Sequence, residues 1–370
     1  MARILVMTIA HPPADARIFH REIAALRDYG HEVTYAAPFV AFGQEPPVGV
    51  RTVDLPRSSG SPLKRLPAMA AAVRLVRRER RSQDVVLVHD PELLPALAAA
   101  RLGGRRPVPV WDVHEDVPAQ VAMLPLPRPL KAPIAALIHA AELIAERSFR
   151  LLVAESAYLE RFRRPHPFVP NSVRVPPGGP WPADGPARVV YLGSLTWPRG
   201  AAELIALARL VPEIRFEIMG NAKTDVAEAL RAAEAELPNL DYQGFVPNDV
   251  ALARLPGALA GLSLLHDEPN YAHSEPTKVM EYMAHAVPSL TTPNPASRAL
   301  VERADAGAVV GFGDVDAAAV VLRRWDADRA ERERLAARAY AVASAHDWTV
   351  DGRAFAATLQ DWADGGSADG

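Results

Sequence analysis

The chain alternates between short apolar runs and longer segments in which apolar residues recur every three or four positions. The first apolar run, Ile4 to Thr8, is typical of a buried strand, and the spacing from Ile18 to Leu26 predicts a helix that ends near Gly30. A second apolar run follows at Val33 to Ala36. This strand–helix–strand order predicts a parallel sheet with helices on its faces.

Further segments of both kinds fill the amino-terminal half. The strands are predicted at residues 50–55, 84–88, 108–113 and 151–154, and the helices at 63–81, 93–102 and 133–149. The helix over 63–81 is basic and has an apolar side. This side is formed by Leu66, Met69, Val73 and Val76.

A stretch rich in Pro and Gly, residues 165–186, separates this half from a second half with the same order of elements. There the strands are predicted at 188–192, 215–219, 241–244, 261–265, 289–292 and 308–310, and the helices at 201–210, 250–255, 315–324, 328–345 and 348–362. We therefore expect an α/β fold of two βαβ domains with a cleft between them. The predicted parts are a first domain at 1–172, a linker at 173–187, a second domain at 188–346, a helix at 347–364 that crosses back to the first domain, and a disordered tail at 365–370.

The most informative stretch, Asn270 to Pro288, reads NYAHSEPTKVMEYMAHAVP. It combines a polar turn with a helix that carries Lys278 and Glu281, and Ser274 is a suitable N-cap because its hydroxyl can accept from a free backbone N–H. A helix N-terminus beside a lysine attracts phosphate, and Glu281 on roughly the same face can accept from sugar hydroxyls. The stretch indicates a diphosphate site, although the same residues also fit a capped surface helix with a Lys–Glu pair.

Polar residues follow several strands of the first half. The loop from His11 to Arg17 comes after the first strand, His89 and Asp90 come after another, and His114 and Glu115 after a third. Ligands of open parallel sheets bind at the carboxyl ends of the strands. Each histidine alone fits a hydrogen-bonded loop residue, but the repetition favours a binding site. No G-x-G-x-x-G follows the first strand, so a standard dinucleotide site is not expected.

Composition limits the partners. The 370 residues carry a formal net charge of -3 and no cysteine, so we expect no nucleic acid, no disulfide and no thiolate metal site. The run His266-Asp267-Glu268 does not have the spacing of a metal site, and none is predicted. No apolar run is long enough to cross a bilayer, so a cytoplasmic protein is expected.

The helix predicted at 63–81 ends in a cluster of five arginines: Arg74, Arg77, Arg78, Arg80 and Arg81. Such a cluster fits a solvated helix end, where cations are favoured by the helix dipole. It also leaves open an anionic acceptor site or a weak peripheral contact with the inner membrane face.

Several motifs, in order, resemble those of the family 4 retaining glycosyltransferases, which have the GT-B fold of two Rossmann-like domains. They are HPPADARIFHREIAALRDYGHEV near the start, then VHDPELLPALAA, WDVHEDVP, VPNSV, YLGSLTWPRG, SEPTKVMEYMAHAVP and the closing HDWTV. Together they extend over nearly the whole chain. The resemblance implies transfer of a sugar from a nucleotide diphosphate donor to an acceptor hydroxyl, with retention at the anomeric carbon and without a metal.

The resemblance also implies a role for individual residues. Arg199 and Lys278 would hold the diphosphate, and His114 would complete the catalytic set by reaching the donor sugar near its reactive carbon. The implied donor-binding set is Gly193, Ser194, Arg199, Gly220, Phe245, Val246, His273, Ser274, Thr277, Lys278 and Glu281. The set on the acceptor side is His11, Asp15, Arg17, His89, Asp90 and Glu115. No cofactor is expected. A UDP-sugar is favoured as donor, and the acceptor would be a sugar, a lipid-linked glycan or a small natural product.

Two positions depart from the family pattern. The family often has a glutamate eight positions before the ribose-binding one, where this chain has His273, and many relatives have arginine after the glycine equivalent to Gly193, where it has Ser194. Two alternatives therefore stay open. One is a nucleotide-sugar epimerase or hydrolase on the same scaffold, and the other is a non-catalytic protein that binds nucleotide-sugars.

Overall fold

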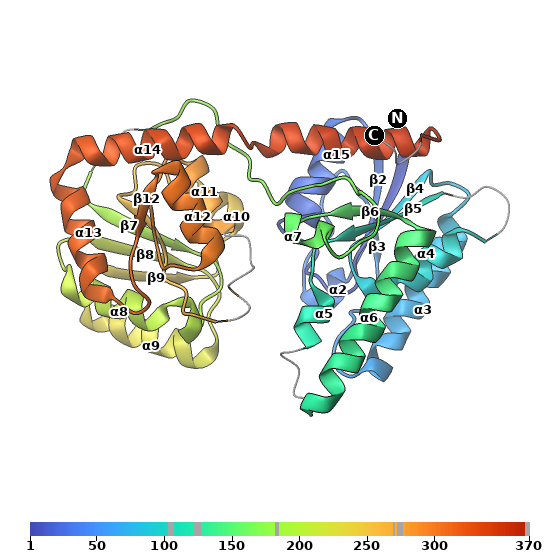
Figure 1. Ribbon diagram of the computed structural model, residues 1–370, viewed down its shortest axis with the longest axis horizontal. Coiled ribbons are helices and arrows are strands. Elements are labelled where there is room, and N and C mark those ends of the chain that lie inside the picture. The colour runs from blue at the N-terminus through green and yellow to red at the C-terminus, as the bar shows by residue number, and fades with distance from the viewer. Residues whose placement is uncertain (103–106, 122–126, 182–184, 269–270, 272–276, 367–370) are drawn as a thin grey trace. The chain divides into compact units, whose positions relative to one another are not determined.

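The computed structural model describes residues 1–102, 107–121, 127–181, 185–268, 271 and 277–366. The chain forms two compact units, one of Met1–Asn171 with Thr349–Gly370 and one of Ser172–Trp348. In the described residues each unit contains one sheet of six parallel strands with helices on its faces (Figure 1). This confirms the predicted α/β fold of two βαβ domains.

The sheet of the first unit has the strand order β3-β2-β1-β4-β5-β6. Its strands are β1 (Arg3–Met7), β2 (Glu32–Ala37), β3 (Arg51–Asp54), β4 (Val85–Val88), β5 (Val108–Val113) and β6 (Arg150–Val153). Its helices are a π-helical turn (Ile18–Ile23) that continues into α1 (Ala24–Asp28), α2 (Phe39–Phe42), α3 (Pro62–Glu79), α4 (Leu94–Ala100), α5 (Val117–Gln120), α6 (Arg128–Ser148), α7 (Ser156–Leu159) and α15 (Trp348–Ala363). A single 3-10 turn (Pro91–Leu93) precedes α4.

The sheet of the second unit has the order β12-β11-β10-β7-β8-β9. Its strands are β7 (Arg188–Leu192), β8 (Arg215–Met219), β9 (Leu240–Gly244), β10 (Ala260–Ser263), β11 (Ser289–Thr291) and β12 (Gly307–Val309). Its helices are α8 (Ala201–Leu210), α9 (Thr224–Glu236), α10 (Asn248–Leu252), α11 (Thr277–Ala284), α12 (Pro295–Ala304), α13 (Val315–Ala327) and α14 (Arg329–Ser344). A 3-10 turn (Trp197–Arg199) precedes α8.

Every strand predicted from an apolar run occurs at or next to its predicted position. The helices were less predictable. The sequence analysis missed α9 and α12, and it started the helix of α6 at Pro133, whereas the helix begins at Arg128. Pro133 lies inside α6, where its missing N–H removes one hydrogen bond of the helix without ending it.

The apolar side of α3 is only partly buried. Leu66 is 52% exposed, whereas Ala68 and Ala72 are buried together with Leu75 and Val76. These four buried residues belong to the hydrophobic core of the first unit, and Leu66 is left outside it.

The segment predicted as a linker, 173–187, is grouped with the second unit. Trp348 N donates to Val173 O at 3.0 Å, and Tyr340 Oη donates to Pro176 O at 2.7 Å. The end of α15 is grouped with the first unit, where His31 Nε2 lies 3.2 Å from Ala356 O. Among the described helices, none combines the length and the apolar character that a membrane span requires.

Tyr282 fastens α11 to the second sheet. Its ring is fully buried, and its hydroxyl donates to Leu262 O at 3.1 Å and accepts from Leu192 N at 3.0 Å. A side chain on Gly261 would lie 2.2 Å from the ring, so the strand must have glycine at this position. One phenol thus connects the helix to two neighbouring strands, β7 and β10.

We expect Tyr282→Phe to destabilise the second unit by about 1–3 kcal/mol, because Leu192 N would lose its acceptor in a buried place. The matched control is Tyr242→Phe, since the Tyr242 hydroxyl makes only a 3.5 Å contact with Gly220 O. Urea denaturation of both variants, followed by circular dichroism, measures the difference. Equal losses of stability in the two variants would contradict the role given to Tyr282.

Candidate functional site

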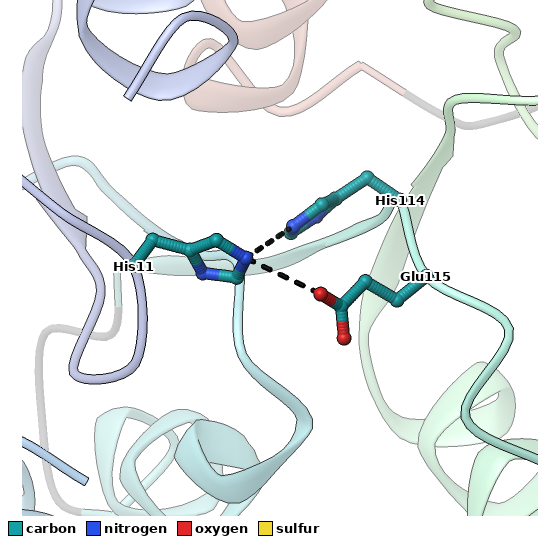
Figure 2. A group of neighbouring side chains, drawn as sticks. All are labelled: His11, His114 and Glu115. Carbon is teal, nitrogen blue, oxygen red and sulfur yellow. Dashed lines mark hydrogen bonds and ion pairs between the residues drawn. The ribbon is translucent and has the colours of Figure 1, made fainter. Parts of the chain in front are cut away.

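Polar side chains from three neighbouring strands meet at one edge of the first sheet. His11 follows β1, Asp90 follows β4 and His114 follows β5, and these three strands are adjacent in the sheet. His11 Nδ1 lies 2.7 Å from Asp90 Oδ1, and His11 Nε2 lies 3.3 Å from both His114 Nε2 and Glu115 Oε1 (Figure 2). The structure therefore brings together four of the residues that the sequence analysis selected.

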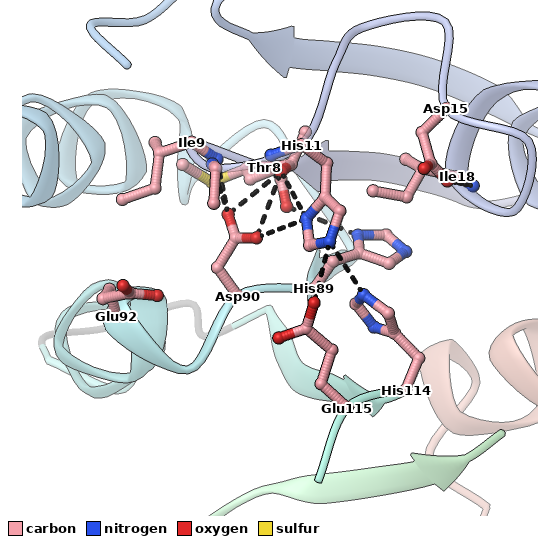
Figure 3. Close-up of polar contacts among 12 residues, drawn as sticks. Thr8, Ile9, His11, Asp15, Ile18, His89, Asp90, Glu92, His114 and Glu115 are labelled. Atoms are coloured by element: carbon pink, nitrogen blue, oxygen red, sulfur yellow. Dashed lines mark hydrogen bonds and ion pairs between the residues drawn. The ribbon is translucent and has the colours of Figure 1, made fainter. Parts of the chain in front are cut away.

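Asp90 is held in place by several hydrogen bonds within this cluster (Figure 3). It is buried and accepts hydrogen bonds from the Thr8 hydroxyl and from the backbone N–H groups of Ile9 and Ala10. Burial opposes its ionisation, but the contact with His11 and these donors hold the pKa of Asp90 below its ordinary value. Burial also works against the charged form of His11, yet its hydrogen bonds to Asp90 and Glu115 raise the pKa of His11 to about 10.

A buried layer of charges lies beneath the cluster. Arg17 is 6% exposed and donates to both carboxylate oxygens of Asp112, at 2.7 and 2.8 Å. Arg17 Nε also lies 3.0 Å from Glu22, whose other oxygen lies 2.8 Å from His89 Nε2. Because Arg17 and His89 are buried and bonded here, they do not line a surface, which differs from their predicted place on the acceptor side.

Asp112 connects the two layers and was missed by the sequence analysis. Burial opposes its ionisation, but the charge of Arg17 holds the pKa of Asp112 well below its ordinary value. Its Oδ2 lies 3.4 Å from His114 Nδ1. The sequence signal for this residue is an aspartate inside the apolar run of β5. Asp15 also has a structural contact, since its Oδ1 accepts from the backbone N–H groups of Arg17 and Ile18.

In the second unit, Arg199 and Lys278 are the two cations of the predicted donor site. Lys278 Nζ is buried 3.9 Å from the centroid of the Tyr191 ring and forms no hydrogen bond to any described residue. Burial and the neighbouring charge of Arg199 lower the pKa of Lys278 to about 7, against the influence of Glu281. Arg199 is half-buried, with its Cζ 5.8 Å from the centroid of the Tyr271 ring.

Glycines bring two loops into contact near these cations. Gly193 follows β7 and Gly220 follows β8, and a Cβ on Gly220 would lie 1.8 Å from Gly193 O. Both have positive φ, which favours glycine. Ser194, which replaces the arginine common in the family, is exposed, and its backbone oxygen accepts from the Tyr191 hydroxyl at 3.0 Å.

The remaining predicted donor residues are placed as follows. Thr277 is the first residue of α11, and Glu281 is half-buried one turn after Lys278. Phe245 is 68% exposed directly after β9, whereas Val246 packs against the core. His273 and Ser274 lie outside the described residues, and with them the predicted N-cap.

Two groups of three potential metal ligands occur among the described residues. One is His11, His114 and Glu115, and the other is Glu22, His89 and Asp112. Neither group includes His266, whose Nε2 lies 2.8 Å from Glu203. Local sequence spacing indicates neither group, because the ligands of each come from segments that are distant in sequence.

Solved structures share this fold over almost the whole chain. WaaG, a glycosyltransferase involved in lipopolysaccharide biosynthesis, is 16% identical with a TM-score of 0.69, and the alignment covers 98% of this chain and 100% of WaaG. Sucrose-phosphate synthase from Thermosynechococcus elongatus is 14% identical with a TM-score of 0.71, covering 98% and 99%. HepE from Anabaena, in complex with UDP and glucose, is 14% identical with a TM-score of 0.69, covering 98% and 100%. No curated protein sequence matches the chain.

The burial of Lys278 lowers the free energy of unfolding by an amount that depends on pH. Its pKa is about 7 in the folded protein and ordinarily 10.5, so between these values the unfolded chain binds more protons. Lys278 should then contribute a rise of the free energy of unfolding with pH in this window, by up to about 1.4 kcal/mol per pH unit, whereas the raised pKa of His11 contributes a fall. We expect the stability difference between Lys278→Met and the wild type to shrink as the pH rises through this window, with the variant the more stable of the two at pH 7.

Urea denaturation across this pH window measures the effect. The matched control is Lys223→Met, because Lys223 is exposed, and it should keep the wild-type profile. A Lys278→Met variant whose stability changes with pH in parallel with the wild type would contradict the burial of this amine.

The carboxy-terminal part of the chain also matches a protein family by sequence. Residues 199–358 match the family described as glycosyl transferase-like, and this range includes Arg199, Lys278 and Glu281. The matched range, the motifs and the fold agree with one another. The carboxy-terminal part of the chain thus resembles a glycosyl transferase-like family by sequence, and the whole chain shares the two-domain GT-B fold of solved glycosyltransferases.

Proposed function

We propose that the protein transfers a sugar from a nucleoside diphosphate donor to an acceptor hydroxyl, with retention at the anomeric carbon and without a metal at the diphosphate. The observation that carries this proposal is Lys278. Its amine is buried beside a second cation, Arg199, and is bonded to no described residue. A buried amine whose charge is unfavourable in the free protein is suited to an anionic ligand, which would supply the missing partner.

The same two cations explain how the bond to the sugar would break. Negative charge grows on the diphosphate as it leaves, and fixed positive groups that face it lower the energy of the transition state by several kcal/mol. Lys278 belongs to the first turn of α11, where backbone N–H groups without helical partners add to the positive potential. In the proposed reaction one diphosphate oxygen accepts the proton of the acceptor hydroxyl on the same face of the sugar. This course retains the configuration and needs no protein nucleophile.

Other residues of the second unit would hold the nucleoside. Glu281 would accept from the ribose hydroxyls, since it follows Lys278 by one turn of α11. Phe245 is 68% exposed and offers an aromatic face on which a base can stack. Gly220 would let the base approach the backbone closely. The UDP in the HepE complex supports a uridine nucleotide as the donor.

The acceptor would be bound by the first unit, at the cluster of His11, His114 and Glu115. Imidazole nitrogens and a carboxylate at one point suit the hydroxyls of a sugar, a glycan on a lipid or a small natural product. His114 would contact the reacting sugar. The exposed Leu63 and Leu66 in the first turns of α3, the helix that ends in the arginine cluster, support a weak peripheral membrane contact for a lipid-linked acceptor.

We expect at least one nucleoside diphosphate, UDP first, to raise the melting temperature, because a ligand that binds only the folded state stabilises it. Arg199→Ala and Glu281→Ala should each weaken this binding by about tenfold or more, since each removes a charged hydrogen-bonding group. The matched control is Arg209→Ala, because Arg209 is exposed and paired with Glu236. Unchanged affinity in Arg199→Ala would contradict the diphosphate site.

We expect His114→Ala to lower turnover by about a hundredfold or more while changing donor affinity little, because His114 would act on the reacting sugar. Product formation, followed by thin-layer chromatography, measures turnover, and calorimetry measures donor affinity, so the two effects are separated. A loss of donor affinity with normal turnover would remove His114 from this role. Free sugar or an isomerised donor without any acceptor would instead support a hydrolase or an epimerase.

A further inference from the structure

Three side chains at the edge of the first sheet converge on one point (Figure 2). His11 Nε2 lies 3.3 Å from His114 Nε2 and 3.3 Å from Glu115 Oε1. The three potential ligand atoms all lie within 4.8 Å of one another. Each of the three residues is half-buried, so the point is accessible to a small ion from solvent.

Both histidines are oriented by a carboxylate on their other side. His11 Nδ1 lies 2.7 Å from Asp90 Oδ1 (Figure 3), and His114 Nδ1 lies 3.4 Å from Asp112 Oδ2. A carboxylate at Nδ1 favours the tautomer whose Nε2 carries the lone pair. Carboxylates behind metal-binding histidines do the same in metalloproteins, and they also fix the direction of the ring. Both Nε2 atoms therefore face the same point, and each can present a lone pair to a metal ion there once the second proton of His11 is displaced.

The two nitrogens and the carboxylate oxygen at these distances need a positive charge between them. In the metal-free protein a proton on His11 Nε2, shared with Glu115, can supply it, and a metal ion would displace that proton. The spacing suits a metal ion. Ligand atoms at about 2.0–2.1 Å from a tetrahedral zinc ion are about 3.3–3.4 Å apart. The two distances from His11 Nε2 match this value, and the Glu115 side chain, 38% exposed, has room to adjust its carboxylate.

The second group of potential ligands provides a contrast within the same unit. Glu22, His89 and Asp112 are completely buried, and the guanidinium of Arg17 contacts both carboxylates. The protein itself thus supplies the cation there. This second group does not require an ion and is closed to solvent.

We propose that His11 Nε2, His114 Nε2 and Glu115 Oε1 bind one divalent transition-metal ion, for which Zn²⁺ is the best match. Two imidazoles and one carboxylate are a ligand set that zinc uses in proteins, and three protein ligands leave a fourth position open. Asp90 and Asp112 are positioning residues for the two rings. The site differs from the diphosphate site, whose cations are Arg199 and Lys278 of the second unit.

A bound metal ion has a consequence that rests on the proposed function. It would occupy the Nε2 of His114, which the transfer reaction would need, so Zn²⁺ should inhibit transfer and a chelator should restore it. Binding of the metal is measured without any sugar donor. Failure of the metal proposal is therefore distinguishable from failure of the proposed transfer.

The test is a titration of the full chain, free of histidine tags and stripped with a chelator, with Co²⁺ and then Zn²⁺. Co²⁺ in a site of low coordination number gives strong visible absorption, and calorimetry gives the stoichiometry and affinity for Zn²⁺. We expect one ion per chain. Glu115→Gln removes one ligand and Asp90→Asn removes the carboxylate behind His11, and each should weaken Zn²⁺ binding by about 10–100-fold.

The matched control is His139→Ala, because His139 is also a half-exposed histidine beside a carboxylate, Glu142, but belongs to no group of three ligands. It should bind Zn²⁺ like the wild type. Glu115 is on the surface side of the cluster, so its substitution should leave the fold intact. Circular dichroism of the variant tests this. Absence of the Co²⁺ absorption, or equal Zn²⁺ affinity in Glu115→Gln, His139→Ala and the wild type, would overturn the proposal.

Discussion

All strands of each sheet are parallel, and this imposes one constraint on both units: the strands end at the same edge, and the loops that leave them lie side by side. In the first unit the neighbouring strands β1, β4 and β5 bring His11, Asp90 and His114 within hydrogen-bonding distance, although they are far apart in sequence. In the second unit the neighbours β7 and β8 bring Gly193 against Gly220. The sheets therefore determine which loops can form a site, and the side chains determine its chemistry.

The two units differ in how their buried positive charges are compensated. In the first unit the guanidinium of Arg17 is matched by Asp112 and Glu22, so the buried layer is internally neutralised and can orient the groups above it. In the second unit the buried amine of Lys278 lies near Arg199 and is bonded to no described residue. A lysine whose positive charge is unfavourable in the ligand-free protein is typical of a binding site, where a ligand completes the set of interactions.

The sequence predicted the strands well, because each is a short apolar run between turn residues. It missed α9 and α12, although α9 buries Val226 and Leu230 and α12 buries Val301 and Ala304 at helical spacing. It selected His11, Asp90, His114 and Glu115 from their places after strands, and the structure brings them together. It assigned Arg17 and His89 to the acceptor side or the cleft, whereas both are buried. The burial of Arg17 depends on Asp112, a residue of another strand that local patterns do not connect to it. The roles of the donor residues rest on the family resemblance, and His273 and Ser274 lie outside the described residues.

The assignment of α15 to the first unit has a consequence for biosynthesis. The first unit is discontinuous, since the whole of the second unit lies between Asn171 and Thr349. On a ribosome, the helix that buries Phe355, Leu359 and Trp362 is made after every other element of both units. The second unit is continuous and can fold before α15 is made. Until then, part of the apolar surface of the first unit stays exposed to solvent. Removal of α15 would leave this newly made surface open to aggregation and to chaperones, even though every strand that the structure describes would be present.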